Sequence, residues 1–297
     1  MLSWAAAAIG SDVRIVDVRP LHGDQGPWML QFEHAPGLTA AVLKGGPPSP
    51  RVGPFMIATG AAALEAAARN GLVAPRLIAA DLDGGRTGGV TTLETVVAGS
   101  TAWPAPPSAE RLRAAGAALA AVHAVPMEPT DHLPFRPRPI AVDDFAGDRR
   151  QGRMPTTRLL KDADRLVAAR GRPVGATVFV HGDVWPGNLV WTDDEQAVLI
   201  DWKTAGVGAP GVDLAELRKQ VSIVFGAQAP ELVLEGWEHA SGSRAPDVAY
   251  WDVVAALNTP TQLDDGYLLG GWAQLDGAAA TSRRDAFLEA ALARIDD

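Results

Sequence analysis

Three oxygen-bearing side chains, those of Asp183, Asn188 and Asp201, stand among short apolar segments where isolated polar residues are not expected by chance. The apolar segments are residues 177–180, 189–191 and 197–200. Their lengths and their content of Val, Leu and Ile are typical of buried strands. The polar residues 192–196 separate the last two segments and predict a turn.

A hairpin made of the last two segments would bring these polar side chains together. A turn centred between Asp194 and Glu195 pairs residues at equal distances from that point, so Asn188 lies opposite Asp201. Asp183 lies in the loop just before the hairpin. Two carboxylates and an amide oxygen at one point form a site of hard oxygen ligands, which suits Mg²⁺ that holds phosphates.

The same arrangement is what phosphoryl transfer requires. One Asp accepts the proton of the substrate hydroxyl, an Asn and a second Asp bind metal, and here these are Asp183, Asn188 and Asp201. Two alternatives are a strand-end turn of any α/β protein and half of a metallohydrolase site. The second needs more histidine ligands, and the six His residues are scattered, without H-x-H or H-E-x-x-H spacing.

Four sequence elements resemble those of the aminoglycoside phosphotransferase family, small-molecule kinases with a protein-kinase-like fold. They are H-x-D-x-x-x-x-N at residues 181–188, I-D-[WF] at 200–202, D-L-A at 213–215 and L-A-x-[LV]-H at 119–123. Their order and spacing make the resemblance specific. We expect His181 to hold the catalytic loop, Asp213 to organise it, and His123 to be a satisfied core histidine.

The resemblance implies an α+β, protein-kinase-like bilobal fold. A small N-terminal lobe with an antiparallel sheet plus a helix, residues 1–98, would bind the nucleotide. A larger, mainly helical C-terminal lobe, residues 99–297, would carry catalysis and substrate binding. The implied cofactors are ATP, with GTP as an alternative, and Mg²⁺.

Sequence patterns predict elements that agree with this order. Strands are expected over residues 13–18, 29–33, 39–44, 77–80 and 91–97, with a helix over 57–70 between the third and the fourth. Further helices are expected after Ser108, over 156–170, 213–226, 229–240 and 246–257, and from Ser282 onward.

Lys44 is the expected phosphate ligand, because it ends an apolar strand and the family places its phosphate-binding Lys on the third strand. A surface lysine at a strand end is the alternative. By resemblance, Glu94 and Val96 would present backbone groups to the purine. Two features depart from the family pattern. Gly60 stands where the helix partner of the lysine is expected, with Glu65 five residues later, and the turn at residues 23–26 lacks a full G-x-G-x-x-G.

The acceptor would bind to the C-terminal part, where the family uses acidic residues to meet amino groups. The candidate segment, residues 258–272, contains Asp264, Asp265 and Trp272. Carboxylates would bind ammonium groups and an aromatic face would stack on a ring. Trp185, inside the catalytic loop, is a further candidate. An ordinary helix-capping loop explains the same segment about as well.

Composition excludes several other classes of protein. The chain has 297 residues and no cysteine, so disulfides, thiol nucleophiles and thiolate metal sites are excluded. The apolar start at residues 4–9 lacks a basic region before it, and no apolar run approaches about 18 residues. We therefore expect no signal peptide, no membrane span and a cytoplasmic location.

The formal net charge of −9 makes nucleic acid an unexpected partner, because an acidic protein repels polyanions. Residues 1–98 carry 8 acidic and 7 basic residues, whereas residues 99–297 carry 27 acidic and 19 basic ones. The second part would attract a cationic substrate, although a solvated acidic surface explains the excess as well.

The function expected from these residues is ATP-dependent transfer of phosphate to a hydroxyl of a small, amino-bearing molecule. The first form is an antibiotic-resistance kinase for an aminoglycoside or related natural product. The second is a metabolic kinase for an amino sugar, amino alcohol or similar metabolite. The third is a nucleotide-binding protein without turnover, suggested by the missing helix partner of Lys44. The sequence leaves open whether the protein is a monomer or a homodimer.

Overall fold

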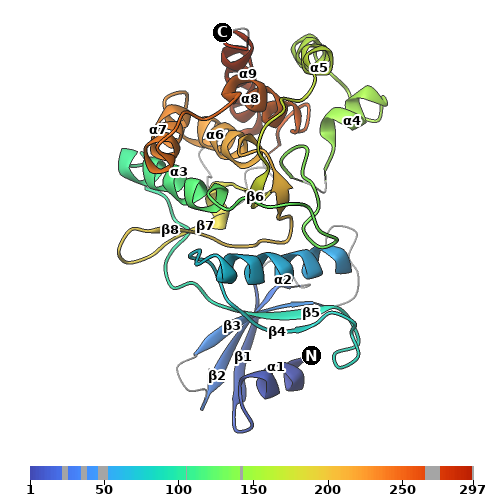
Figure 1. Ribbon diagram of the computed structural model, residues 1–297, viewed down its shortest axis with the longest axis vertical. Helices are drawn as coiled ribbons and strands as arrows, with labels where there is room; N and C mark the ends of the chain where they lie inside the picture. The colour runs from blue at the N-terminus through green and yellow to red at the C-terminus, as the bar shows by residue number, and fades with distance from the viewer. Residues whose placement is uncertain are drawn as a thin grey trace.

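The computed structural model describes residues 1–21, 26–34, 39–45, 53–104, 106–140, 143–264 and 275–295. An antiparallel sheet lies at one end of the molecule and most helices gather at the other, with helix α2 between them (Figure 1). The expected α+β architecture is confirmed: a small sheet with a helix comes first, and a larger, mainly helical part follows.

The N-terminal sheet has the strand order β1-β2-β3-β5-β4. Its strands are β1 (Arg14–Pro20), β2 (Trp28–Glu33), β3 (Ala40–Gly45), β4 (Leu77–Asp81) and β5 (Thr91–Thr95). The expected order of three strands, a helix and two strands is confirmed. Lys44 pairs with Thr92 and Val42 with Glu94. Because alternate residues of a strand share a face, Lys44 and Glu94 lie on the same face of the sheet.

Two helices accompany this sheet. Helix α1 (Leu2–Ile9) was not predicted as a helix; its Ala5 is fully buried against apolar residues of the sheet. Helix α2 (Pro54–Arg69) begins three residues before the predicted start, since Pro54 fits the first turn of a helix. Its Leu64 joins the largest apolar cluster together with Trp202 of the C-terminal part. Helix α2 therefore joins the two parts through the core.

The C-terminal part consists of helices around two short strand pairs. The helices are α3 (Ala109–His123), α4 (Phe145–Arg150), α5 (Arg158–Arg170), α6 (Gly211–Phe225), α7 (Ala229–Ser241), α8 (Val248–Leu257) and α9 (Gly277–Leu292). The pairs are β6 (Val178–Val180) with β9 (Gly206–Gly208), and β7 (Leu189–Trp191) with β8 (Ala197–Leu199). The predicted cap Ser108 accepts a hydrogen bond from Arg111 N at 3.1 Å. The predicted start of the last helix at Ser282 was wrong, because Asp276 caps it.

The β7–β8 hairpin forms as predicted, but its predicted register was wrong by one residue. The amide of Ile200 donates to the carbonyl of Asn188 at 3.0 Å, so Asp201 lies one residue beyond the pair. The difference arises in the turn, where Glu195 adopts the left-handed conformation with a φ of 61° and Thr192 N bonds to Gln196 O. Such a turn takes up one residue more than the symmetric turn that the sequence suggested.

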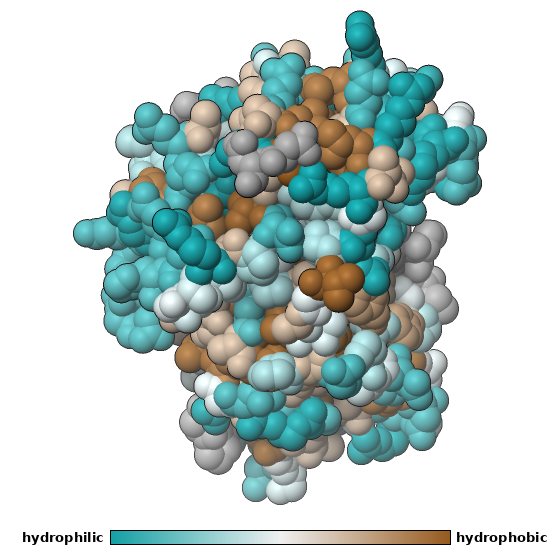
Figure 2. Space-filling view, turned by 45° about the horizontal axis from the view of Figure 1, so that its top comes forward, coloured by the Kyte–Doolittle hydropathy of each residue, from teal (hydrophilic) through white to brown (hydrophobic). Residues whose placement is uncertain are grey.

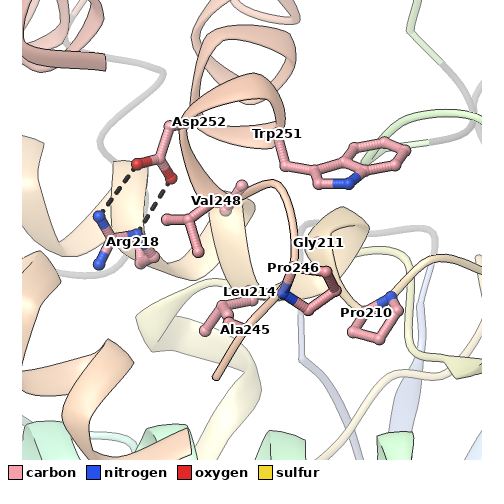
Figure 3. Close-up of a pocket in the computed structure, with 10 residues that line it drawn as sticks. Pro210, Gly211, Leu214, Arg218, Ala245, Pro246, Val248, Trp251 and Asp252 are labelled. Atoms are coloured by element: carbon pink, nitrogen blue, oxygen red, sulfur yellow. Dashed lines mark hydrogen bonds and ion pairs between the residues drawn. The ribbon is translucent and has the colours of Figure 1, made fainter. Parts of the chain in front are cut away.

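Helix α6 is anchored to helix α8 by a fully buried ion pair (Figure 3). Arg218 donates to both carboxylate oxygens of Asp252, at 3.0 and 2.9 Å. At the start of α6, Gly211 lies so close to Trp251 that an added Cβ would come within 2.1 Å of the indole ring. These contacts fix the first turn of α6, which contains Asp213.

The face shown in Figure 2 is largely hydrophilic, and its apolar side chains are scattered in small areas. Among the helices of the described residues, none has both the length and the apolar character needed to cross a bilayer.

Candidate active site

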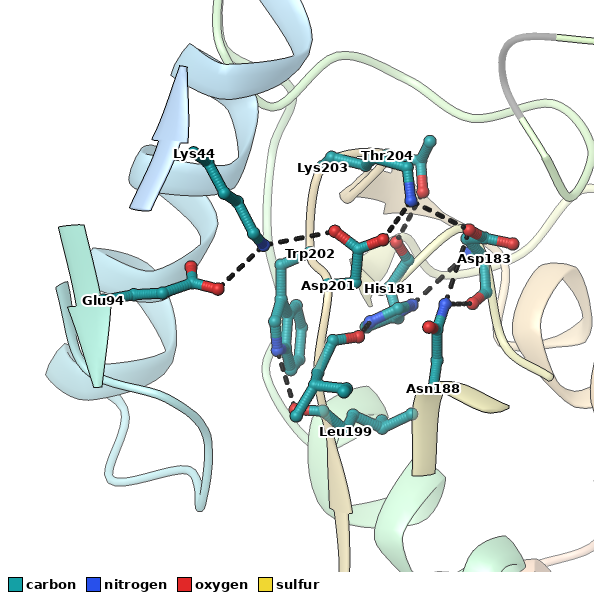
Figure 4. A network of polar contacts seen from close by, with 11 residues as sticks. Lys44, Glu94, His181, Asp183, Asn188, Leu199, Asp201, Trp202, Lys203 and Thr204 are labelled. Carbon is teal, nitrogen blue, oxygen red and sulfur yellow. Dashed lines mark hydrogen bonds and ion pairs between the residues drawn. The ribbon is translucent and has the colours of Figure 1, made fainter. Parts of the chain in front are cut away.

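A chain of alternating charges joins the sheet to the C-terminal part (Figure 4). From Glu94, it runs through Lys44, Asp201 and Lys203 to Asp183. Lys44 Nζ lies 2.8 Å from Glu94 Oε1 and 3.2 Å from Asp201 Oδ1. Lys203 Nζ contacts Asp201 Oδ2 and lies 3.4 Å from Asp183 Oδ2. We call these five residues the charge chain.

Lys44 is held between carboxylates from two parts of the sequence. Its side chain is 17% exposed, and those of Glu94 and Asp201 are 9% and 30% exposed. Burial disfavours the ammonium ion, but Glu94 and Asp201 outweigh that effect and raise the pKa of Lys44 above its usual range. Lys44 therefore carries a fixed positive charge on the sheet face that looks toward Asp201.

Glu94 replaces the partner that the sequence lacks on the helix. Glu65 is 58% exposed and lies 3.6 Å from Arg69 on the outer surface of α2, so it does not pair with Lys44. The partner instead comes from β5, the strand next to β3. At Gly60, α2 runs close to the backbone of Lys203, where an added Cβ would lie 3.7 Å from Lys203 Cα.

Asp201 occupies an unusual backbone conformation for its residue type. Its φ is 63°, in the left-handed region that few non-glycine residues adopt. The next residue, Trp202, is buried and donates from its indole nitrogen to Leu199 O at 3.0 Å, which fixes the bend. Burial would raise the pKa of Asp201, but Lys44 and Lys203 outweigh it, so the pKa lies well below the usual range. Asp201 is therefore a permanent anion.

Asp183 and Asn188 lie together at the other end of the charge chain. The amide nitrogen of Asn188 donates to the backbone oxygen of Asp183 at 2.9 Å and to Asp183 Oδ2 at 3.4 Å. Asn188 ends the short 3₁₀ helix η2 (Pro186–Asn188). Lys203 also contacts Oδ2, whereas the other carboxylate oxygen of Asp183 points away from Lys203 and Asn188 (Figure 4).

Asp213 holds the loop that carries Asp183 through hydrogen bonds to the backbone of that loop. Asp213 accepts hydrogen bonds from the backbone amides of His181 at 2.6 Å and Gly182 at 2.7 Å. It also lies 3.2 Å from His123 Nε2, whose other ring nitrogen accepts from Trp237 at 2.9 Å. Burial raises the pKa of Asp213, but these partners outweigh burial and lower it.

His181 is fully buried near the carboxylates of Asp183 and Asp201. Its Nε2 is 2.8 Å from Ile200 O, and its ring meets the edge of Trp202 at a centroid distance of 4.6 Å. Burial lowers the pKa of His181, which favours the neutral ring. Its contacts tie the loop at Asp183 to the end of strand β8.

The residues predicted to bind metal fit a hard divalent cation by their donor chemistry. Asp201 offers a carboxylate, and Asn188 offers its amide oxygen, since its nitrogen is engaged by Asp183. Across the described ranges no cluster of three or more His, Asp or Glu side chains is arranged to hold a metal. One carboxylate and one amide oxygen suit Mg²⁺, which takes further ligands from phosphates and water.

Other predicted site residues lie outside the charge chain. Val96 follows the end of β5 and is 37% exposed. Trp185 is half-buried, and its ring lies over Gly187, where an added Cβ would be 2.1 Å away. Asp264 is exposed in the segment after α8. Asp265, Trp272 and most of the turn at residues 23–26 lie outside the described residues.

Sequence reasoning missed Lys203 and the role of the Glu94 side chain. Glu94 was expected to contribute backbone groups, whereas its carboxylate contacts Lys44. For Lys203 a signal existed, because a lysine two residues after Asp201, the aspartate predicted to bind metal, adds a charge to an otherwise apolar segment. For Glu94 the signal lay in the register of β3 and β5, which a single sequence does not give.

We predict that Asp213→Asn lowers the free energy of unfolding by about 3 kcal/mol at pH 7, because it breaks a buried, hydrogen-bonded charge. Asp162→Asn, which removes two exposed ion pairs on α5, with Arg158 and Arg165, should cost about 0.5 kcal/mol or less. Urea unfolding measures both.

The sign of the pH dependence follows from the lowered pKa of Asp213. The contribution is fully present above the unfolded-state pKa of about 3.9 and is lost as pH falls through the native value. The difference between wild type and Asp213→Asn should therefore shrink only below about pH 4. A difference that already disappears near neutral pH would contradict the assignment.

Comparison with known proteins places this chain in a family. The sequence model of the phosphotransferase enzyme family matches residues 17–257. Among curated proteins, none matches the sequence.

Solved structures share the fold at low sequence identity. A candidate aminoglycoside phosphotransferase from Ralstonia eutropha has 14% identity and a TM-score of 0.65, over 99% of this chain and 96% of that one. Macrolide 2'-phosphotransferase from Brachybacterium faecium has 20% identity and a TM-score of 0.60, over 97% of each chain. An amicoumacin kinase in complex with AMP-PNP and Ca²⁺ has 10% identity and a TM-score of 0.61, over 97% of this chain and 92% of that one. Because the family match spans most of the sequence, the protein belongs to the phosphotransferase enzyme family and is a small-molecule phosphotransferase.

Proposed function

We propose that the protein is an ATP-dependent O-phosphotransferase that transfers the γ-phosphate to a hydroxyl of a small, amino-bearing molecule. The observation that carries the proposal is the charge chain, in which a strand lysine contacts a metal-type aspartate, and Lys203 links that aspartate to a base-type aspartate. GTP is the alternative donor. The amicoumacin kinase of the same fold was solved in complex with AMP-PNP and Ca²⁺, which supports nucleotide and divalent metal use.

Each residue receives a role from its position. Lys44 would bind the nucleotide phosphates and the segment around Val96 would meet the purine. Asn188 and Asp201 would hold Mg²⁺, which neutralises phosphate charge when bound. Residues 1–98 would form the nucleotide-binding lobe and residues 99–297 the catalytic lobe. Ser100 pairs with Trp191 as the chain crosses between them, which supports the boundary.

The chemical step needs a single proton acceptor. Asp183 would accept the proton of the acceptor hydroxyl on its other carboxylate oxygen, because Oδ2 is engaged by Lys203 and Asn188. The hydroxyl oxygen then forms a bond to the γ-phosphorus, and the bond from that phosphorus to the bridging β-phosphate oxygen breaks. ADP leaves with the electron pair of that bond, so atoms and charge balance.

The contact between Glu94 and Lys44 argues against the alternative of a nucleotide-binding protein without turnover. That alternative depended on a phosphate-binding lysine with no acidic partner, and Glu94 supplies the partner at 2.8 Å. An oriented, permanently charged Lys44 is what binding of phosphates requires.

The acceptor is proposed from charge rather than from contacts. The excess of acidic residues after residue 98 favours a cationic molecule near the catalytic loop. Asp264, Asp265 and Trp272 remain our candidates for binding it, with Trp185 beside the base. Proteins of this fold include a macrolide 2'-phosphotransferase and a choline kinase, so an antibiotic acceptor and a metabolic one stay in competition.

We predict that Glu94→Gln lowers kcat/KM for the nucleotide by about 10- to 100-fold, because Lys44 loses a charge-assisted hydrogen bond. Glu65→Gln is the matched control on helix α2 and should leave kcat/KM unchanged, since its carboxylate is exposed. Initial rates at varied ATP give both values. Equal kinetics for the two variants would show that Glu94 does not orient Lys44.

Asp183→Asn should lower kcat by about 10²- to 10⁴-fold while the nucleotide dissociation constant stays nearly the same, because the base acts only in the transition state. Asp193→Asn, an exposed residue of the β7–β8 turn, serves as the control and should behave like wild type. Single-turnover rates and nucleotide titrations separate the two effects. An Asp183→Asn enzyme with normal turnover would exclude Asp183 as the base.

ATP consumption with a panel of acceptors tests the proposed function. The panel pairs each hydroxylated amine with one analogue that lacks the hydroxyl and another that lacks the amine. We expect ATP consumption and a phosphorylated product only with the hydroxyl present, and a higher KM without the amine. No turnover with any hydroxylated acceptor would contradict the proposal. Antibiotic susceptibility of a host that expresses wild type or Asp183→Asn then separates resistance from metabolism.

A further inference from the structure

The second lysine of the charge chain has no contact with the nucleotide or the acceptor in the function proposed so far. Lys203 lies two residues after Asp201, and its ammonium contacts Asp201 Oδ2 and lies 3.4 Å from Asp183 Oδ2. Among the described residues, it is the one cation within salt-bridge distance of Asp183. A lysine between the two carboxylates that flank the reaction occupies the place where the transferred group must pass.

The geometry points to Lys203 as a catalytic residue whose ammonium binds the transferred phosphoryl group. The inference rests on the proposed function, because it takes Asp183 as the base and Asp201 as the residue on the metal side. The acceptor hydroxyl must approach Asp183 while the nucleotide phosphates approach Asp201. The phosphorus that moves from one to the other therefore passes beside the group that contacts both carboxylates.

The ammonium of Lys203 contacts Asp183 and Asp201 and is also accessible to a ligand. The side chain of Lys203 is 24% exposed, and those of Asp183 and Asp201 are 19% and 30% exposed. By contrast, Lys219 on helix α6 is fully buried beside Glu216 and offers no such surface. Lys203 can thus exchange a carboxylate contact for a phosphate contact without breaking the core.

The backbone around Lys203 is fixed relative to the catalytic loop. Thr204 Oγ1 donates to His181 O at 3.4 Å, and Gly182 lies so close to Thr204 O that an added Cβ would be 2.3 Å away. Helix α2 approaches from the other side at Gly60. A lysine on so constrained a backbone keeps its reach toward Asp183 constant, which positioning of a reacting group requires.

The net charge of the charge chain also supports binding of the phosphoryl group by Lys203. The charge chain contains three carboxylates and two lysines, so its protein groups sum to −1. Without Lys203 the sum is −2 around the place where the terminal phosphate must bind. Preorganised positive charge at the transferred group stabilises a transition state in which charge spreads over the phosphoryl oxygens.

The test compares a triphosphate with a diphosphate. Calorimetric dissociation constants for the β,γ-imido analogue of ATP and for ADP, both with Mg²⁺, are measured on wild type, Lys203→Met and Lys161→Met. Lys161 is an exposed lysine on α5 and controls for loss of a charge. We expect Lys203→Met to weaken the triphosphate analogue by about 10- to 100-fold more than ADP and to lower kcat by about 10²-fold.

A purely structural counter-ion gives a different result. It would weaken both nucleotides equally, or neither, and either result overturns the inference. If Lys203→Met does not fold, Lys203→Arg keeps the charge between the carboxylates and is titrated in the same way. A guanidinium has a different shape from an ammonium, so triphosphate affinity should change while ADP affinity holds. Equal changes for the two ligands again overturn the inference.

The same data separate this inference from the proposed function. If wild type binds neither nucleotide, the proposed function itself fails. If wild type binds both, and Lys203→Met keeps the wild-type ratio of their affinities, the role of Lys203 fails alone.

Discussion

The site depends on one partly exposed carboxylate that two lysines hold from opposite sides. Asp201 contacts Lys44 from the N-terminal sheet and Lys203 from its own loop. Burial alone would raise the pKa of Asp201, but the positive charges of the two lysines outweigh burial and lower it. Because Lys44 and Asp201 are 157 residues apart in sequence, this ion pair also links the two parts of the fold. The proposed phosphate-binding site therefore also joins the sheet to the helical part.

Most of the catalytic loop could be predicted because its residues are close in sequence. Asp183, Asn188 and Asp201 lie within one short stretch, and local strand and turn patterns suffice to bring them near one another. The error in the hairpin register did not change the prediction that Asn188 and Asp201 lie near each other, since both residues lie just outside the paired strands. What failed was the turn, where the left-handed conformation of Glu195 depends on local energetics that residue type alone does not determine.

The long-range partners could not be predicted in the same way. Glu94 meets Lys44 because Val42 pairs with Glu94 across β3 and β5, and shifting that register by one residue would turn the carboxylate to the opposite face. Likewise, the reach of Lys203 to Asp183 depends on the bend at Asp201 and on contacts of Thr204 with the loop. The sequence predicted which elements exist, whereas these contacts depend on how the elements meet.

The acidic partner of Lys44 comes from strand β5 and not from helix α2, so the position of α2 does not determine the orientation of Lys44. Lys44 and Glu94 belong to neighbouring strands of one sheet, so a shift of α2 would leave their 2.8 Å contact intact. The helix instead contacts the backbone of Lys203 at Gly60, where an added Cβ would lie 3.7 Å from Lys203 Cα. Any coupling between α2 and catalysis would therefore act on Lys203 and on the bend at Asp201. In this chain the sheet fixes Lys44, which we propose binds the nucleotide, and helix α2 lies against the backbone of Lys203, beside the proposed base.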